Sequence, residues 1–191
     1  MNAAWQMWSG RFAPEWCSLI VQLARELPAQ NASVMVKNQA KTQNDTRRTT
    51  VRWIKREHQE LNFLFPLLED FFHEANHAAF GVELWRLRSI QFTEYHESVQ
   101  GHYDWHNDVL WGDGTPVHRK LSMVIQLSDP SEYEGANLEL KPFYLNAPDE
   151  TMLKQQGTVI VFPSIVEHRV TPITKGTRYS MVAWMEGPKW R

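Results

Sequence analysis

Two histidine–aspartate pairs lie four residues apart and share a spacing that suits metal binding. One consists of His106 and Asp108, and the other of His102 and Asp104. On a β-strand, side chains two positions apart project from the same face, so either pair can offer an imidazole and a carboxylate to one cation. The spacing alone does not choose between the two pairs.

A third ligand must come from elsewhere in the chain. His168 is the candidate, because it follows the strand-like run GTVIVF and Pro163. Two histidines and one carboxylate on one side of an octahedral metal leave three positions open. That facial arrangement suits non-haem Fe(II), which binds a co-substrate and O2 together.

A second metal-binding pattern lies on a predicted helix. His73, Glu74 and His77 match His-Glu-x-x-His, which would put both histidines on one face with the glutamate as general base. Neither Glu94 nor Glu97, the candidate third ligands, lies on a convincing following helix. With eight histidines in the chain, one chance match is not surprising. A zinc metalloprotease is therefore kept only as an alternative function.

The segment 47–56, RRTTVRWIKR, groups five basic residues around a tryptophan. It could contact phosphates or stack on a base. The alternative, which we favour, is a strand whose arginines alternate into solvent or pair with acidic neighbours. The net charge of −2 gives no global reason to expect a nucleic-acid partner.

Composition bounds the class of protein. The 191 residues suffice for one domain with a sizeable core, and 42% hydrophobic and 22% charged residues are ordinary for a globular chain. No apolar run approaches the ~20 residues of a membrane helix, and residues 1–12 lack the apolar stretch of a secretory signal. Cys17 is the only cysteine, which excludes an internal disulfide. We therefore expect a cytoplasmic protein without a membrane partner.

Other reactive side chains are expected to be structural. Cys17 lies on a predicted helix, where it would be a small core residue. His58, His96 and His118 have no partner pattern, so we interpret them as surface or hydrogen-bonded structural histidines.

The order of apolar patterns predicts the fold. Amphipathic helices are expected over 14–27 and about 61–80, and strands over Ser33–Lys37 and Thr50–Ile54. After Gly81, short apolar or alternating runs alternate with turn signals such as 112–114 and 129–131. These runs cover 84–95, 101–110, 120–127, 137–140, 158–162 and 177–185. The pattern predicts an α+β, mainly β fold, a jelly roll with N-terminal helices packed on one sheet.

Four motifs follow one another over about half of the chain. Residues 91–108 (QFTEYHESVQGHYDWHND) place two tyrosines before His-x-Asp, and 119–128 (RKLSMVIQLS) form an apolar strand. Residues 133–140 (YEGANLEL) come next, and 157–184 contain His-x-Val-x-Pro-x-Thr-x-Gly-x-Arg. This series resembles the prolyl 4-hydroxylase-like Fe(II)/2-oxoglutarate-dependent dioxygenases, which have a double-stranded β-helix fold. One departure is Gly-Ala-Asn at 135–137, where that family has Gly-Gly in a turn.

The resemblance assigns roles to the candidate residues. It implies that His106, Asp108 and His168 bind the metal, because the earlier pair lies too early in the motif. It also implies that Arg178 forms a salt bridge with the distal carboxylate of 2-oxoglutarate, which its planar fork can grip with two hydrogen bonds. Tyr103 has the opposite strand parity from His106, and its role stays open.

Further side chains are expected around the co-substrate. By the same resemblance, Tyr95 would offer its phenol to 2-oxoglutarate. Ser122, Val124 and Gln126 share one strand parity and could line the pocket beside it. Many relatives have a tyrosine where Gln126 stands, and Gln126 can still donate a hydrogen bond. Trp105 is expected to point away from the metal and to pack in the core.

The implied cofactors are Fe(II), 2-oxoglutarate as co-substrate and O2, with ascorbate as a candidate addition. Oxidative decarboxylation would give succinate and CO2 and drive hydroxylation of a second substrate, while the protein orients the reactants and excludes water. We therefore expect an enzyme that hydroxylates a peptide, a protein or a small molecule. A non-catalytic jelly-roll binding module is the other alternative, and the presence of all three ligands and Arg178 counts against it.

The chain is expected to be one oxygenase domain over 1–191, with 1–82 as helical N-terminal support and 83–191 as the jelly-roll core. The polar loop Asn38–Thr46 is a candidate lid over substrate. The substrate and the oligomeric state cannot be read from the sequence.

Overall fold

A computed structural model of the chain describes most of its residues, namely 4–31, 46–109, 111, 114, 116–141 and 147–190. The predicted strand Ser33–Lys37, the predicted lid loop up to residue 45 and most of the turn at 112–114 lie outside the described residues. None of the helices in the described ranges combines the length and apolar character that crossing a membrane requires.

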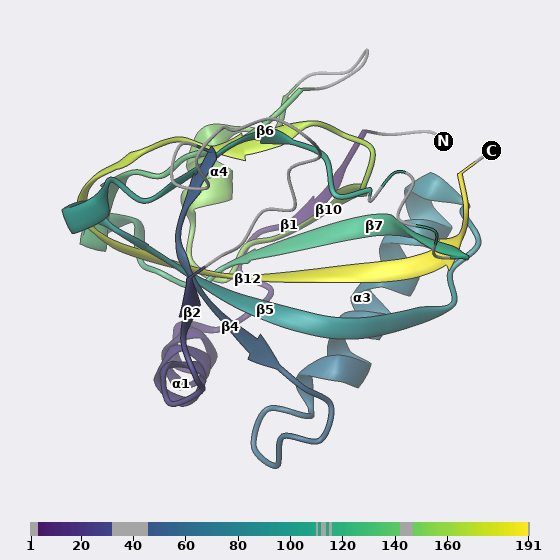
Figure 1. The fold of residues 1–191 in the computed structure, drawn as a ribbon, viewed down its shortest axis with the longest axis horizontal. Coiled ribbons are helices and arrows are strands. Elements are labelled where there is room, and N and C mark those ends of the chain that lie inside the picture. Colours follow the sequence, from purple (N-terminus) through teal and green to yellow (C-terminus); the bar gives the residue numbers. More distant parts are fainter. Residues whose placement is uncertain are drawn as a thin grey trace.

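Two antiparallel sheets and two longer helices form three layers (Figure 1). The large sheet has the strand order β1-β10-β7-β12-β5-β4-β2, with β8 paired to β12, and the small sheet has the order β3-β6-β11-β9. In Figure 1, β6 lies above the large sheet and α1 lies below it. The predicted class, a mainly β jelly roll with N-terminal helices on one sheet, is confirmed.

The elements have the following bounds. The large sheet consists of β1 (Gln6–Trp8), β10 (Val159–Pro163), β7 (Val117–Gln126), β12 (Ile173–Pro188), β5 (Arg86–His96), β4 (Thr50–Ile54), β2 (Gln30–Asn31) and β8 (Tyr133–Gly135). The small sheet consists of β3 (Arg47–Arg48), β6 (His102–His106), β11 (His168–Val170) and β9 (Leu138–Leu140). The helices are α1 (Pro14–Arg25), α3 (Leu64–Ala75) and α4 (Glu150–Lys154), with shorter turns η1 (Asn76–Phe80), η2 (Glu97–Val99) and η3 (Pro130–Glu132).

The first predicted helix is confirmed and ends two residues early, at Arg25. It begins at Pro14, whose ring fixes φ and whose missing N–H is not needed in the first turn. Cys17, Ile20 and Ala24 are its buried residues, and their spacing of three and four puts them on one stripe. Burial raises the pKa of the Cys17 thiol to about 11, as expected of a small core residue.

The second predicted helix is confirmed over Leu64–Ala75, and it continues as the π-helical turn η1. The turn ends at Gly81, where a φ of 62° requires the left-handed conformation that glycine tolerates. The Asn76 side chain closes this end, since it donates to the Val82 carbonyl (2.8 Å) and accepts from the Val82 N–H (2.9 Å).

The residues before position 82 supply strands as well as helices. Strands β1, β2 and β4 extend the large sheet, and β3 adds to the small one. Of these, β4 was predicted from its alternation, whereas the other three have only two or three residues and show no periodicity. The proposed division at position 82 stays a prediction.

The two faces of the large sheet have different contents. One face packs against α1 and α3, and most of its strand residues are buried apolar side chains, among them Phe92, Met123 and Met181. The other face looks toward the small sheet and carries buried polar side chains, among them Ser122 and Arg178. We call these the helix face and the concave face.

Candidate metal centre and co-substrate site

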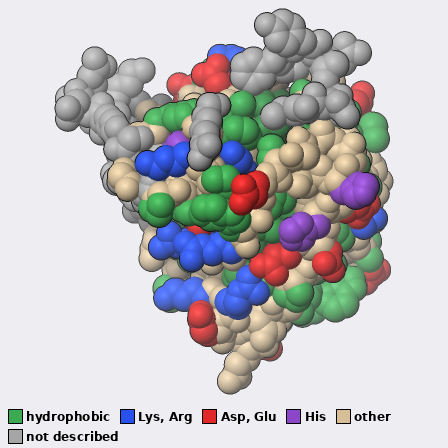
Figure 2. Space-filling model, turned by 90° about the vertical axis from the view of Figure 1, so that its right-hand side faces the viewer, with side chains coloured by type: hydrophobic (Ala, Val, Ile, Leu, Met, Phe, Trp, Pro, Cys, Tyr) green, Lys and Arg blue, Asp and Glu red, His purple; other side chains and the backbone are tan. Residues whose placement is uncertain are grey.

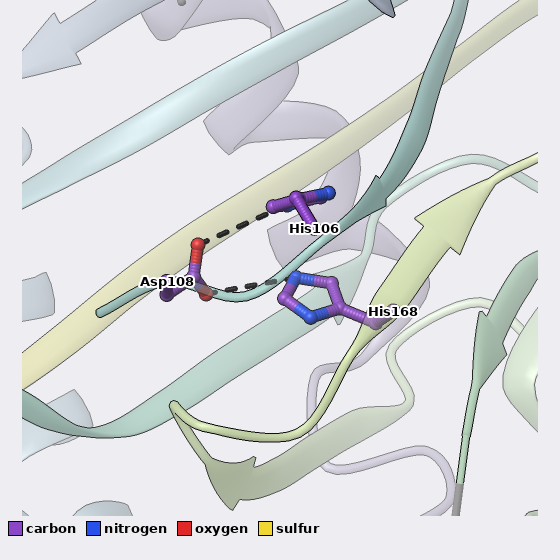
Figure 3. Close-up of side chains that lie close together, drawn as sticks. All are labelled: His106, Asp108 and His168. Atoms are coloured by element: carbon purple, nitrogen blue, oxygen red, sulfur yellow. Dashed lines mark ion pairs between the residues drawn. The ribbon is translucent and has the colours of Figure 1, made fainter. Parts of the chain in front are cut away.

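Three candidate ligands meet between the two sheets (Figure 3). His106 ends β6, Asp108 follows it by two residues, and His168 begins β11. The Nε2 atoms of His106 and His168 lie 3.8 and 3.6 Å from the two carboxylate oxygens of Asp108. One ligand atom from each residue lies within 4.8 Å of the others, which leaves room for a cation between them.

Both imidazoles are oriented by backbone carbonyls. The Nδ1 of His106 lies 2.7 Å from the Asp104 carbonyl oxygen, and the Nδ1 of His168 lies 3.0 Å from that of Val166. A carbonyl can only accept, so each Nδ1 carries the proton and donates it. The lone pair of each ring is therefore on Nε2, the atom that faces Asp108.

The carboxylate of Asp108 is held by neighbouring polar groups. The Ser122 hydroxyl donates to Oδ2 (2.6 Å) and lies 2.9 Å from the Ser164 hydroxyl. The Asp108 N–H donates to the Ser164 carbonyl (2.9 Å), which fixes the backbone as well. Ser122 was expected beside the co-substrate, and the structure places its hydroxyl against Asp108.

The protonation states suit metal binding. Burial alone would raise the pKa of Asp108, but His168, Arg119, His106 and the Ser122 hydrogen bond together lower it to about 2. Burial is the main cause and the neighbouring His168 the second, and together they lower the pKa of His106 to about 3. At neutral pH the site therefore presents an ionised carboxylate and a neutral imidazole, the forms that bind a metal.

A β-bulge explains the position of Tyr103. Between β6 and β11, His168 pairs with His106 and Val170 pairs with Tyr103. The four residues 103–106 of β6 therefore lie opposite the three residues 168–170 of β11. The extra residue reverses the alternation and brings Tyr103 to the same side as His106. The two rings stack with centroids 3.5 Å apart, and the Arg47 guanidinium carbon lies 4.4 Å from the Tyr103 ring centroid.

The rival pair does not take part in the cluster. The Nδ1 of His102 lies 2.8 Å from the Gln100 carbonyl oxygen, and Asp104 is exposed. The core position expected for Trp105 is wrong. Its half-buried ring lies beside two cations on the outer side of the small sheet, 4.4 Å from Lys141 Nζ and 4.8 Å from the Arg169 guanidinium carbon.

A second group of polar side chains lies on the concave face around Arg178, in the first half of β12. Arg178 is buried, and its Nε donates to Gln126 Oε1 (2.9 Å). The Gln126 amide nitrogen donates to the Ser128 carbonyl (3.1 Å) and to the Tyr133 hydroxyl (3.0 Å), so Gln126 holds the arginine in place. Tyr95 is buried beside it, with its ring centroid 5.3 Å from the guanidinium carbon.

Two polar atoms of this group have no hydrogen-bond partner among the described residues. They are the buried Nη1 of Arg178 and the buried hydroxyl of Ser180. Sequence reasoning missed Ser180, although its position two residues after Arg178 on one strand places both on one face. Val124, which was expected to line the pocket, also faces this side and pairs with Val182.

The metalloprotease pattern does not form a site. His73 and His77 are exposed on the helix side of the molecule, and Glu74 forms an ion pair with Arg11 (2.6 Å). Among the described residues, the only metal-ligand cluster is that of His106, Asp108 and His168. The zinc metalloprotease alternative is therefore not favoured.

The remaining polar residues named from sequence have structural contacts. His58 accepts from the backbone N–H groups of Glu60 and Leu61, His96 lies near Thr177 and Glu94, and His118 accepts from the Trp190 N–H. In the basic segment, Arg52 and Arg56 pair with Glu94 (2.7 Å) and Glu69 (2.6 Å). The structure thus agrees with pairing to acidic neighbours.

Solved structures share this fold and define its class. A Pseudomonas putida prolyl 4-hydroxylase superposes with a TM-score of 0.73 at 17% identity over 96% of this chain and 93% of its own. The viral collagen prolyl hydroxylase of Paramecium bursaria Chlorella virus 1, in its 2-oxoglutarate complex, gives 0.68 at 16% identity over 97% of both chains. At these identities the likeness establishes the fold, the jelly roll of 2-oxoglutarate oxygenases.

Sequence comparison then gives the family. The profile of the 2OG-Fe(II) oxygenase superfamily matches residues 90–186, half of the chain, so the chain belongs to that superfamily. Membership implies Fe(II), 2-oxoglutarate and O2. Curated relatives include PKHD-type hydroxylases of Hyphomonas neptunium (31% identical over 42% of this chain and 34% of the relative) and Thermosynechococcus vestitus (38% over 44% and 37%). The matches span about a third of those relatives' length.

Proposed function

We propose that the chain is an Fe(II)- and 2-oxoglutarate-dependent hydroxylase in which His106, Asp108 and His168 hold the metal. The arrangement of these three side chains carries the proposal, together with the oriented imidazoles and the ionised carboxylate. Two imidazoles and one carboxylate occupy one side of an octahedral ion and leave the other side for co-substrate and O2.

The concave face also fits 2-oxoglutarate. The Nη1 of Arg178 is a buried charged donor without an acceptor among the described residues, which is costly unless a ligand supplies one. The distal carboxylate of 2-oxoglutarate would accept from Arg178 and from the Ser180 hydroxyl. Gln126 would act through Arg178, because it already holds the Nε of the guanidinium. Tyr95 would contact the co-substrate beside Arg178.

The residues of this chain orient and protect the reactants. When bound, the iron and 2-oxoglutarate supply the oxidising chemistry that inserts oxygen into a C–H bond. The backbone carbonyls of Asp104 and Val166 keep both Nε2 atoms directed at the metal, and Ser122 keeps the Asp108 carboxylate in position. The buried concave face excludes water from the reacting centre.

The second substrate is proposed to be a peptide, a protein side chain or a small molecule. One structural neighbour, a prolyl hydroxylase of Trichoplax adhaerens, is a complex with a peptide fragment of the hypoxia inducible factor oxygen degradation domain (TM-score 0.70, 15% identity). That neighbour supports a peptide as one candidate substrate. We also propose a cytoplasmic location, on the ground that the lone Cys17 thiol needs no oxidising compartment.

Anaerobic titration with Fe(II) and 2-oxoglutarate tests this proposal. The wild type should develop the weak visible charge-transfer band of an iron-bound 2-keto acid, and with O2 it should form succinate. His106→Ala should lose the band. Arg178→Ala should weaken 2-oxoglutarate binding far more than metal binding.

The chain provides matched controls for both variants. His102→Ala alters the rival histidine, and Arg169→Ala removes an arginine on the outer side of the small sheet that pairs with Glu139 (2.8 Å). Both should behave as the wild type does. No band in the wild type, or an unchanged band in His106→Ala, would overturn the assignment.

A further inference from the structure

The concave face continues past the metal ligands toward the C-terminal end of β12. Trp184 lies there, six residues after Arg178, a distance of about 20 Å along an extended strand. Trp184 pairs with Ser122 across the sheet, and Ser122 donates to Asp108. Trp184 therefore lies on the metal's side of the sheet, at the opposite end from the arginine assigned to the co-substrate.

The indole of Trp184 carries an unused donor. Its side chain is 7% exposed, and its buried Nε1 has no hydrogen-bond partner among the described residues. Most buried polar atoms in proteins are paired, because a donor without an acceptor loses its hydrogen bond to water without compensation. An acceptor supplied by a bound molecule would remove this cost.

A second β-bulge brings a cation to the same place. Along β7 and β12, Met185 pairs with Leu121 but Glu186 pairs with Arg119, so Lys120 is the extra residue. The bulge reverses the alternation and turns Arg119 to the concave side. Its guanidinium carbon lies 3.9 Å from the Trp184 ring centroid, and its Nη1 lies 3.9 Å from Asp108 Oδ1, beyond hydrogen-bond distance.

This end of the molecule is both cationic and aromatic. The Trp53 ring lies next to Trp184, with centroids 6.2 Å apart, and forms a second aromatic wall. Figure 2 shows the side of the molecule at which β12 ends, where Lys and Arg side chains gather beside hydrophobic ones, with Asp and Glu side chains nearby. Such a surface suits a ligand that combines an apolar part with an anionic group.

Positive charge exceeds negative charge around the metal among the described residues. Arg119 faces Asp108, and Arg47 lies over the Tyr103 ring that stacks on His106. Once Asp108 ligates a divalent metal, its charge no longer balances that of Arg119. The two carboxylates of 2-oxoglutarate are themselves taken up by the metal and by the arginine at the other end.

Nearby described carboxylates do not restore the balance. Glu94 is held by Arg52 at 2.7 Å, and it belongs to the opposite parity of β5 from Tyr95. Glu186 is held by Arg86 at 2.9 Å. Glu186 is also the cross-strand neighbour of Arg119 and favours its charged form, but the ion pairs of both acids are with other arginines, so Arg119 can still pair with an anionic group of the substrate.

We propose that the hydroxylated substrate carries a carboxylate, which accepts from Trp184 Nε1 and pairs with the Arg119 guanidinium. The inference rests on the proposed function and specifies its substrate class. The carboxylate can belong to a small organic acid or to an acidic residue of a peptide. Both sources present the same oxyanion to the same donors.

Matched pairs of acids and amides test the inference. Protein loaded with Mn(II) and saturating 2-oxoglutarate under anaerobic conditions is titrated calorimetrically in two arms. One arm uses N-acetyl-glutamate, N-acetyl-aspartate and N-acetyl-proline against their primary amides. The other arm uses short peptides with Glu or Asp against the same peptides with Gln or Asn. The acid member should bind about tenfold or more tightly in one of the arms, and that arm identifies the source.

A conservative variant isolates the indole donor. Trp184→Phe removes the N–H and keeps an aromatic ring, and it should weaken acid binding about tenfold and amide binding less, because a neutral amide oxygen accepts a weaker hydrogen bond than a carboxylate. Trp105→Phe makes the same change on the outer side of the small sheet and should bind the acid as the wild type does. Thermal melts of the loaded proteins check that both variants fold.

The outcomes separate this inference from the function on which it rests. Loss of the charge-transfer band in the wild type refutes the proposed function. An intact band with no acid preference in either arm, including no binding at all, overturns the carboxylate assignment. Equal acid binding by Trp184→Phe and the wild type overturns the role of the indole.

Discussion

The two faces of the large sheet are built from the same strands, but one packs against helices and the other carries the candidate site. The helix face presents buried apolar side chains to α1 and α3, among them Phe92, Met123 and Met181. The concave face buries polar groups at alternate positions of the same strands, such as Ser122, Gln126, Arg178 and Ser180. Among the described residues, three of the four buried side-chain atoms without a hydrogen-bond partner belong to the concave face, namely Arg178 Nη1, Ser180 Oγ and Trp184 Nε1, and the fourth, Asn137 Oδ1, lies outside the large sheet.

The difference separates stability from chemistry. Burial of apolar area against two helices stabilises the sheet, whereas buried donors without acceptors on the other face destabilise it until a ligand binds. A strand can carry both because its side chains alternate. Substitutions on one face should therefore change folding, and substitutions on the other should change binding.

The largest effect is expected from removing the carboxylate ligand. Asp108→Ala should lower the affinity for Mn(II) by more than about 100-fold, because it removes a direct ligand and not merely a supporting group. Isothermal titration measures the change. Asp104→Ala, in the rival pair, is the control, and equal losses in the two variants would refute the choice of ligands.

A substitution in a helix that packs against the helix face should do the reverse. Phe72 is fully buried on α3, so Phe72→Ala should lower the free energy of unfolding by about 3–5 kcal/mol. Urea denaturation measures this, with Leu19→Ala, 40% exposed on α1, expected within about 0.5 kcal/mol of the wild type. Folded Phe72→Ala protein should keep the wild-type Mn(II) affinity, and a large loss of affinity would break the separation of the two faces.

Two adjacent residues of β7, which lie on opposite faces of the sheet, test whether binding and stability are separate. Ser122→Ala removes the hydroxyl that donates to Asp108, and it should lower Mn(II) affinity about tenfold. Met123→Leu, one residue along and on the helix face, should cost less than about 1.5 kcal/mol of stability and leave the affinity unchanged. If the methionine variant lost as much affinity as the serine variant, the faces would be coupled.

A further expected effect is a pH dependence of metal-free stability. The pKa of His106 falls from 6.5 to about 3 on folding, so between these values the unfolded chain binds a proton that the folded chain does not. The unfolding free energy should therefore decrease as pH falls from 6.5 toward 3. Asp108, with its pKa lowered to about 2, acts in the same direction below pH 3.8.

Urea midpoints at pH 7, 5 and 4 measure this slope. His106→Gln removes one titrating group from the concave face and should flatten the slope. Phe72→Ala should shift every midpoint and keep the slope. Identical pH profiles in His106→Gln and the wild type would show that the histidine does not carry the effect.

Part of the fold followed from sequence because its elements repeat over several residues. The helix beginning at Pro14 and the strand Thr50–Ile54 show their periods clearly. Strands β1 and β3, with three and two residues, are too short to show a period and form only through pairing with β10 and β6. The order of the strands in the sheets likewise depends on contacts distant in sequence.

The candidate site shows a different limit. The spacing of His106, Asp108 and His168 could be recognised, but the positions of Tyr103 and Arg119 could not. Each lies beyond a β-bulge, and one extra residue reverses the parity that a sequence argument assumes. The contact of Ser122 with Asp108 was also missed, because it joins a strand to a loop.

The backbone carbonyls that orient the two imidazoles have a consequence for mutational tolerance. Both Asp104 and Val166 contribute through a group that every amino acid possesses. Replacing either side chain leaves the carbonyl acceptor in place, so substitutions at these two positions should not change the orientation of the imidazole rings. Asp108 has no such protection, because Ser122 supports it through a side chain. Inherited change should therefore be tolerated beside the histidines and penalised beside the aspartate.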